Sequence, residues 1–304
     1  AMDQKQIEEL LDPDAISRAE ALGLHARYVV EGYMAGEHKS PYRGFAIEFA
    51  QHREYAPGDD TRHLDWKVLG RTDRYYIKQY EQETNYIANI LLDGSESMQY
   101  GSGKYTKLQY GKMMAACLSY LILHQRDAVA LGIFDENMRD YAPRSDNKGT
   151  IYNIMGRLAA FDGTEKTDIA KTLHDLAVQL RRKGIVIIIS DFFDEEDAIL
   201  DGIQHLRFGG HEVIVLHTLD PDELDFPFQG LVEFHGLEQI PKLLTRPAEI
   251  RKTYQRVFGD FMKRIRRGCE NNHVHYVQVD TSQPLSQVLS SYLTFRLRTA
   301  KSKF

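Results

Sequence analysis

Short apolar runs alternate with helical periodicities along the chain from residue 87 onward. The apolar runs are bounded by polar turns, which is typical of strands buried on both faces of a parallel sheet. The predicted strands cover residues 87–92, 129–134, 139–142 (a short edge strand), 184–190, 213–217, 231–235 (part of a surface hairpin) and 274–279, and the predicted helices cover 108–124, 150–158, 169–180, 194–206, 249–269 and 284–298. This alternation predicts an α/β fold, with a doubly wound, mostly parallel sheet flanked by helices.

The first part of the chain follows a different pattern. We predict an N-terminal helical segment and a small charged and aromatic subdomain over residues 1–84, and the α/β domain over 85–304. The block 53–74 surrounds the only tryptophan, Trp66, with charges of both signs. Because paired structural networks also perturb charged groups, we interpret this block as structural rather than catalytic. Residues 75–80 alternate enough to predict a strand.

Composition and charge exclude several classes of protein. The 304 residues carry a formal net charge of −6, which argues against a general nucleic-acid binder. Two cysteines cannot form a disulfide framework or a zinc site. No apolar run approaches the roughly 20 residues needed to span a bilayer, and the first residues lack a basic-then-apolar signal. We therefore expect a cytoplasmic location.

Oxygen-bearing side chains follow two of the predicted strands. Asp93, Ser95 and Ser97 form an Asp-x-Ser-x-Ser motif after the first strand, and Asp191 follows the run 184–190. In open α/β sheets, ligands bind outside the carboxyl ends of the strands. An all-oxygen set with few carboxylates suits a hard cation such as Mg²⁺. The alternative is a hydroxyl-rich helix entry, in which one of the serines caps the next helix.

This set of oxygens resembles the metal-ion-dependent adhesion site of von Willebrand factor A domains. In those domains, an Asp-x-Ser-x-Ser loop, a threonine loop and an aspartate after the fourth strand hold the metal. The resemblance implies one divalent cation, Mg²⁺ or else Mn²⁺ or Ca²⁺, held by Asp93, Ser95, Ser97, Thr167 and Asp191. Thr164 is the alternative to Thr167 as the threonine ligand.

The segment before this domain resembles the signature of the family called domain of unknown function 58. The matching residues are Arg53 to Tyr55, Pro57-Gly58-Asp59-Asp60, Arg62, Asp65-Trp66-Lys67 and Arg71. The family commonly accompanies MoxR-type AAA+ ATPases. The resemblance therefore implies an adaptor or chaperone-system role, with a MoxR-type ATPase or its client as the protein partner.

We expect a non-enzymatic, metal-dependent protein-interaction module in which an acidic side chain of the partner fills an open metal position. The alternative is a Mg-dependent phosphohydrolase that uses the same acidic site. Ser95 stands where a phosphoaspartyl enzyme carries a second aspartate, and Met98 stands where a Walker motif needs glycine. We interpret the basic stretch 246–267 as a solvated helix face or docking surface. The acidic stretch 194–197 would steer a basic surface of the partner.

Overall fold

The computed structural model describes residues 52–54, 76–78, 87–135, 137–163, 169–180, 182–234 and 243–301. The chain forms two compact units, Met34–Asn85 on the one hand and Ala1–Tyr33 with Tyr86–Phe304 on the other. Most of the predicted segment 1–84 lies outside the described residues, so the predicted domain boundary stays a prediction.

The smaller unit contains one described pair of strands. β1 (His52–Glu54) pairs antiparallel with β2 (Tyr76–Lys78). This pairing confirms a strand within the predicted stretch 75–80. Trp66 and its charged neighbours lie outside the described residues, so their structural role stays a prediction.

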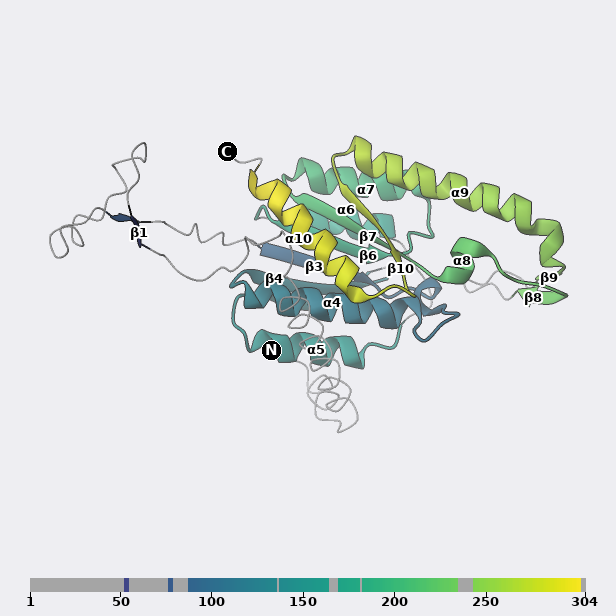
Figure 1. The fold of residues 1–304 in the computed structure, drawn as a ribbon, viewed down its shortest axis with the longest axis horizontal. Coiled ribbons are helices and arrows are strands. Elements are labelled where there is room, and N and C mark those ends of the chain that lie inside the picture. Colours follow the sequence, from purple (N-terminus) through teal and green to yellow (C-terminus); the bar gives the residue numbers. More distant parts are fainter. Residues whose placement is uncertain are drawn as a thin grey trace. The chain divides into compact units, whose positions relative to one another are not determined.

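A six-stranded sheet lies at the centre of the larger unit (Figure 1). Its strands are β3 (Ile87–Asp93), β4 (Ala128–Phe134), β5 (Met138–Ser145), β6 (Ile185–Ser190), β7 (Glu212–Leu219) and β10 (His275–Asp280). They lie in the order β10-β7-β6-β3-β4-β5, and every neighbouring pair is parallel except β4 and β5. This order confirms the predicted α/β fold and places the short edge strand antiparallel at one edge.

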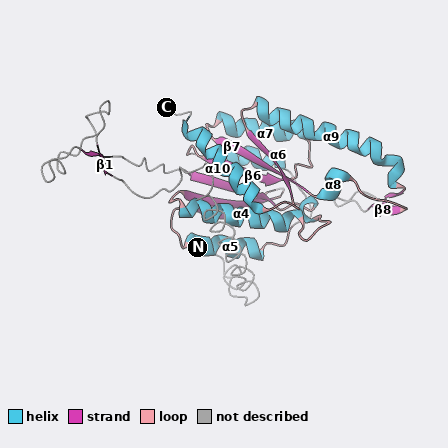
Figure 2. Cartoon of the chain, viewed as in Figure 1, coloured by secondary structure: helices cyan, strands magenta, loops and turns pink. Residues whose placement is uncertain are grey.

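Helices cover both faces of this sheet (Figure 2). One face carries α4 (Lys107–His124), α5 (Thr150–Ala160) and α10 (Leu285–Lys301), and the other carries α6 (Ile169–Gln179), α7 (Glu196–Phe208) and α9 (Pro247–Asn271). The apolar runs fill the space between these layers, and every residue of β6 is buried. Among the described residues, no helix is long and apolar enough to cross a bilayer.

Helix boundaries follow local capping chemistry. Thr106 and Gln109 form a capping box in which each side chain bonds the backbone N–H of the other, so α4 begins at Lys107. The helix predicted from residue 194 instead begins at Glu196. The Asp194 carboxylate accepts a hydrogen bond from the backbone N–H of Ile169 at 3.1 Å, so Asp194 serves the start of α6.

The strand order reverses between β3 and β6. From β3 the chain continues through α4 to β4 on one side, whereas β6 continues through α7 to β7 on the other. In open α/β sheets, ligands bind outside the carboxyl ends of the strands at such a reversal. The residues that follow β3 and β6 therefore lie together at this edge of the sheet.

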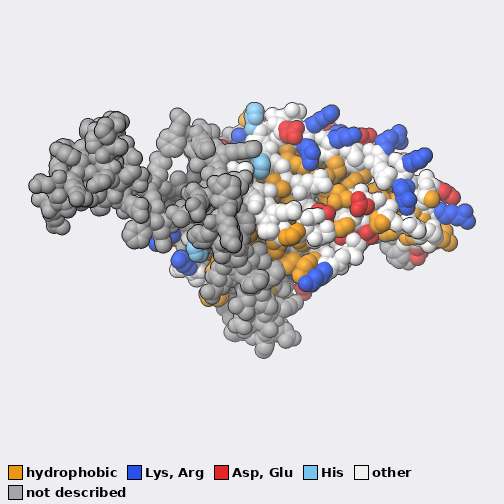
Figure 3. All heavy atoms as spheres, viewed as in Figure 1, with side chains coloured by type: hydrophobic (Ala, Val, Ile, Leu, Met, Phe, Trp, Pro, Cys, Tyr) orange, Lys and Arg blue, Asp and Glu red, His pale blue; other side chains and the backbone are white. Residues whose placement is uncertain are grey.

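Beyond this edge of the sheet, a short helix and a hairpin pack against α9 (Figure 1). They are α8 (Pro221–Asp225), β8 (Val232–Phe234) and β9 (Leu243–Thr245), and β8 pairs antiparallel with β9, which confirms the predicted hairpin strand. An aromatic cluster joins these elements through Phe226, Phe228, Phe234, Tyr254 and Phe258. Lys and Arg side chains lie along the exposed side of α9 (Figure 3).

Candidate metal centre

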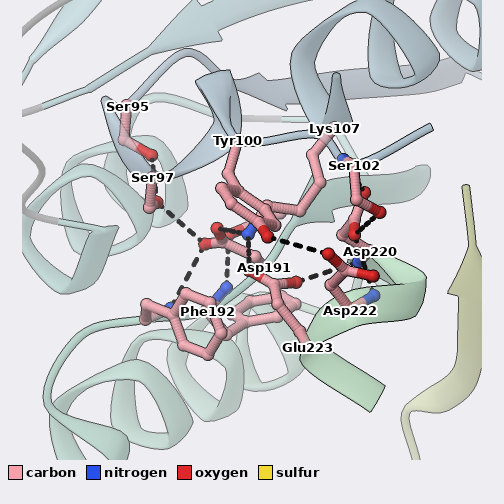
Figure 4. Close-up of polar contacts among 12 residues, drawn as sticks. Ser95, Ser97, Tyr100, Ser102, Lys107, Asp191, Phe192, Asp220, Asp222 and Glu223 are labelled. Atoms are coloured by element: carbon pink, nitrogen blue, oxygen red, sulfur yellow. Dashed lines mark hydrogen bonds and ion pairs between the residues drawn. The ribbon is translucent and has the colours of Figure 1, made fainter. Parts of the chain in front are cut away.

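The structure brings the predicted ligands of β3 and β6 together at this edge of the sheet, where all four are buried. The hydroxyl oxygens of Ser95 and Ser97 lie 3.0 Å apart. Ser97 Oγ donates a hydrogen bond to Asp191 Oδ1 at 3.1 Å (Figure 4). Asp93 lies close enough to Asp191 for the two carboxylates to interact electrostatically. The four side chains therefore lie near one another at the ends of β3 and β6.

The fifth predicted ligand of the site is a threonine. Thr167 and its alternative Thr164 both lie outside the described residues. The threonine position of the site therefore stays a prediction.

Asp93 is fully buried and is held by two donors. Ser190 Oγ donates to Asp93 Oδ2 at 2.6 Å, and the backbone N–H of Ser95 donates to Oδ1 at 2.9 Å. Burial first, and the charge of Asp191 second, raise the pKa of Asp93 to about 7, although these hydrogen bonds oppose the shift. Burial thus disfavours the ionised form of Asp93, and the neighbouring charge of Asp191 adds to this effect.

The backbone at both strand ends has a specific geometry. A Cβ atom on Gly94 would lie 2.3 Å from Phe161 Cζ, so a larger residue after Asp93 would require the Phe161 ring to move. Phe192, directly after Asp191, has a φ of 55°, in the left-handed region. Such a conformation costs a non-glycine residue on the order of 1–3 kcal/mol. A hydrogen bond from the Phe192 N–H to Ser190 Oγ, at 2.9 Å, helps to hold this turn.

Lys107, the first residue of α4, contacts a predicted metal ligand. Its side chain is fully buried, and Nζ lies 2.7 Å from Asp191 Oδ2 and 2.5 Å from Glu223 Oε1 (Figure 4). Burial alone would lower the pKa of the ammonium, but the charges of Asp191 and Glu223 outweigh it, so the pKa is raised. The aromatic ring of Phe193 also lies 4.7 Å from Nζ. Lys107 is thus a buried cation fixed to Asp191.

Glu223 reaches Lys107 from α8. Asp220 and Glu223 form the capping box of this short helix, with Glu223 Oε2 accepting from the Asp220 N–H at 2.9 Å. The Asp220 carboxylate also accepts the backbone N–H of Ser102 at 2.9 Å, from the loop that precedes α4. These bonds fix α8, and with it Glu223, against the loop that leads into Lys107.

A buried histidine is hydrogen-bonded to the backbone of Asp191. His217 Nε2 lies 2.8 Å from the backbone oxygen of Asp191, and Nδ1 lies 2.9 Å from the Tyr276 hydroxyl. Burial lowers the pKa of His217 to about 4, so the ring is neutral. A carbonyl oxygen only accepts, so Nε2 carries the proton and the Tyr276 hydroxyl donates to Nδ1. The backbone of Asp191 is therefore held independently of its carboxylate.

The oxygen spacing fits a six-coordinate cation. Bonds of about 2.0–2.1 Å to Mg²⁺ at right angles place neighbouring ligand oxygens roughly 2.9 Å apart. The separations of 3.0 Å between Ser95 and Ser97, and of 3.1 Å between Ser97 and Asp191, are close to this value. The described residues contain no group of three or more His, Cys, Asp or Glu side chains that could hold a metal ion.

Two members of the network were missed by the sequence analysis. Lys107 and Glu223 belong to no motif, and Glu223 lies 116 positions after Lys107. One signal was present: a lysine directly after a capping Thr106 stands in the first helical turn, where the macrodipole disfavours cations. A lysine in this position predicts an acidic partner nearby, because the partner would offset the unfavourable interaction with the macrodipole.

The predicted acidic stretch 194–197 is partly occupied by contacts within the chain. Besides capping Ile169, Asp194 accepts the N–H of Glu195 at 2.8 Å. Glu196 forms an ion pair with Arg264 of α9, in which Arg264 Nη2 lies 2.6 Å from Glu196 Oε1. This pairing reduces the charge that the stretch presents to a partner.

Known proteins resemble this chain over much of its length. An uncharacterised protein of Mycobacterium tuberculosis is 24% identical over 232 residues, covering 75% of this chain and 72% of the relative, and one of Mycobacterium bovis matches to the same extent. The crystal structure of the conserved hypothetical protein BatB from Bacteroides thetaiotaomicron has 16% sequence identity and a TM-score of 0.48, covering 69% of this chain and 98% of that one. A family model described as "Protein of unknown function DUF58" matches residues 51–262, more than half of the chain. The chain therefore belongs to the DUF58 family.

Proposed function

We propose that this chain is a divalent-metal-dependent protein-interaction module that catalyses no reaction itself. The observation that carries the proposal is that the two oxygens of the Asp191 carboxylate have different partners. Oδ1 accepts a hydrogen bond from Ser97 Oγ, whereas Oδ2 accepts one from Lys107 Nζ. One oxygen of a buried aspartate thus accepts from Ser97 Oγ, which itself lies 3.0 Å from Ser95 Oγ, so three candidate ligand oxygens are neighbours.

Charge balance supports a cation of charge two. Asp93, Asp191 and Glu223 contribute three carboxylates, and Lys107 is the single ammonium bonded to them among the described residues. In the ionised form, these four groups carry a net of two negative charges, and the buried Asp220 beside Glu223 adds to the negative charge nearby. Excess charge in a buried location is unfavourable without a counter-ion, and Mg²⁺, Mn²⁺ or Ca²⁺ would neutralise it.

The residues of the chain divide the work of holding the ion. Asp93 and Asp191 would supply the negative charge, while Ser95 and Ser97 would supply neutral oxygens that donate less charge. When bound, the ion supplies an electrophilic position that accepts one further oxygen. A carboxylate from an Asp or Glu of the partner completes the set, and a surrounding contact surface contributes most of the affinity.

The proposed partner rests on the family resemblance. Because the family commonly accompanies MoxR-type AAA+ ATPases, we propose such an ATPase, or a client passed to it, as the protein bound at this site. The cytoplasmic location and the absence of turnover stay predictions of the sequence. Both oxygens of Asp93 already accept hydrogen bonds, from Ser190 and Ser95, which supports a ligand rather than a free nucleophile.

The test is capture of the ATPase by the parent chain, Asp93→Ala and Asp201→Ala, each with Mg²⁺ and with EDTA. Asp201 is an exposed aspartate of α7 that is not among the candidate ligands, and it serves as the matched control. We expect capture by the parent and Asp201→Ala with Mg²⁺ only, and loss with Asp93→Ala. Equal capture under all conditions would exclude a metal bridge. Phosphoester hydrolysis by the parent, lost in Asp93→Ala, would favour the phosphohydrolase alternative.

A further inference from the structure

We infer that Lys107, held by Glu223, is the positioning residue of the metal site, because it fixes the orientation in which Asp191 meets the cation. The inference rests on the proposed function. It adds to the motif a cation from α4 and a carboxylate from α8 that bind no metal themselves.

The burial of Lys107 is the first argument. An ammonium with no exposed side-chain surface has lost its hydration, and this cost is offset only by well-placed partners. Its place at the first residue of α4 adds an unfavourable interaction with the helix macrodipole. A lysine serving only solubility would lie on the surface, so this position indicates a role for the contact with Asp191.

The second argument concerns the carboxylate torsion. The terminal torsion of an aspartate is broad, so an Asp side chain does not fix the direction of its own oxygens. Lys107 holds Oδ2 at 2.7 Å, which turns Oδ1 toward Ser97 Oγ at 3.1 Å and the Phe193 N–H at 3.3 Å. Without the ammonium, the carboxylate loses the shortest of these contacts, and only the two longer hydrogen bonds to Oδ1 still orient it.

The third argument concerns charge. Glu223 lies on the far side of the same ammonium, at 2.5 Å, and its side chain is only 14% exposed. Lys107 and Glu223 together are a neutral pair, so their joint removal leaves the net charge of the site unchanged. Any loss of metal affinity in a variant lacking both charges therefore reports orientation rather than electrostatic attraction.

The experiment compares Mn²⁺ binding by the parent and by Lys107→Met/Glu223→Gln, using electron paramagnetic resonance of free and bound ion. Loss of a contact that orients a metal ligand typically weakens binding about 10–100-fold, which is the result expected for the double variant. Tyr100→Phe is the matched control, because it removes a 3.4 Å contact from Tyr100 to Asp222 of α8 without touching Asp191. It should bind within about twofold of the parent.

Each outcome decides a separate question. A folded double variant that binds Mn²⁺ as tightly as the parent, with the same bound spectrum, overturns the positioning role. A parent chain that binds no Mn²⁺ overturns the proposed function instead.

A second measurement keeps the inference testable if the double variant does not fold. In the parent chain, the ¹⁵Nζ signal of Lys107 should be visible because its ammonium is buried and hydrogen-bonded. Titration with Mg²⁺ should shift this signal in step with binding, since the ion and the ammonium share Asp191. A signal that does not move while Mg²⁺ binds would overturn the inference.

Discussion

The two oxygens of Asp191 face two differently built halves of the site. On the Oδ1 side, Ser95 and Ser97 come from the same short loop as Asp93. On the Oδ2 side, Lys107 and Glu223 come from separate helices 116 positions apart. The first half holds candidate ligands and the second a fixed ion pair. The difference teaches that the kind of ligand is encoded locally, whereas the direction in which it points depends on distant segments.

The largest loss of stability should come from Lys107→Met alone, which removes the ammonium from the ion pairs with Asp191 and Glu223. Asp191 and Glu223 would remain buried without their ammonium, and removing one member of such a pair costs about 3–5 kcal/mol. Urea unfolding in EDTA measures this loss. Lys148→Met, at an exposed position, is the control and should leave the midpoint unchanged. A loss no larger than the control's would show that the ion pair contributes little to stability.

A smaller effect should appear in the pH dependence of the ligand half. The pKa of Asp93 is 3.8 in the unfolded reference and about 7 in the folded chain, so the folded state binds more protons between these values. The contribution of Asp93 to the free energy of unfolding should therefore be fully present below about pH 4 and be lost as the pH rises through 7.

Thermal melts in EDTA from pH 5 to 8 measure this dependence, with Asp93→Asn as the comparison. The variant has no carboxyl at this position and should lose this part of the slope. Added Mg²⁺ should restore stability at pH 8, because the ion favours the ionised carboxylate. Parallel profiles for parent and variant would show that Asp93 does not titrate as its burial predicts.

Ser97→Ala should separate the halves most clearly. It removes the donor to Asp191 Oδ1 but leaves Lys107 in place, so stability should fall by only about 1 kcal/mol. Mn²⁺ affinity should nevertheless fall by about tenfold or more, because an oxygen directed at the ion is lost. Ser282→Ala, an exposed serine bonded to Asp280, is the control. Unchanged Mn²⁺ affinity would remove Ser97 from the ligand set.

The smallest effect on stability and on Mn²⁺ affinity should come from Glu196→Gln, at the first residue of α7. This side chain pairs with the exposed Arg264 and touches neither half of the site. Exposed pairs contribute little to stability, so both the melting midpoint and Mn²⁺ affinity should stay close to the parent values. A marked loss of Mn²⁺ affinity would mean that the acidic stretch 194–197 acts on the ion directly.

Most of the fold could be predicted because buried parallel strands leave a clear pattern. The runs 87–92 and 184–190 appear as β3 and β6 with nearly the predicted bounds. Helix starts were less certain, since they depend on which side chain caps which helix. Asp194, which serves α6 rather than α7, is the example. The short helix α8 was missed because one turn carries no periodicity.

The sequence by itself determined the kinds of atoms at the candidate site. Asp93, Ser95, Ser97 and Asp191 follow strands whose apolar character is visible in the chain, and parallel strands bring their carboxyl ends to one edge. Only the tertiary structure decided that a buried ammonium shares Asp191 with them. That contact joins α4, β6 and α8, and its energy arises from charges brought together and removed from water by the packing of the whole domain.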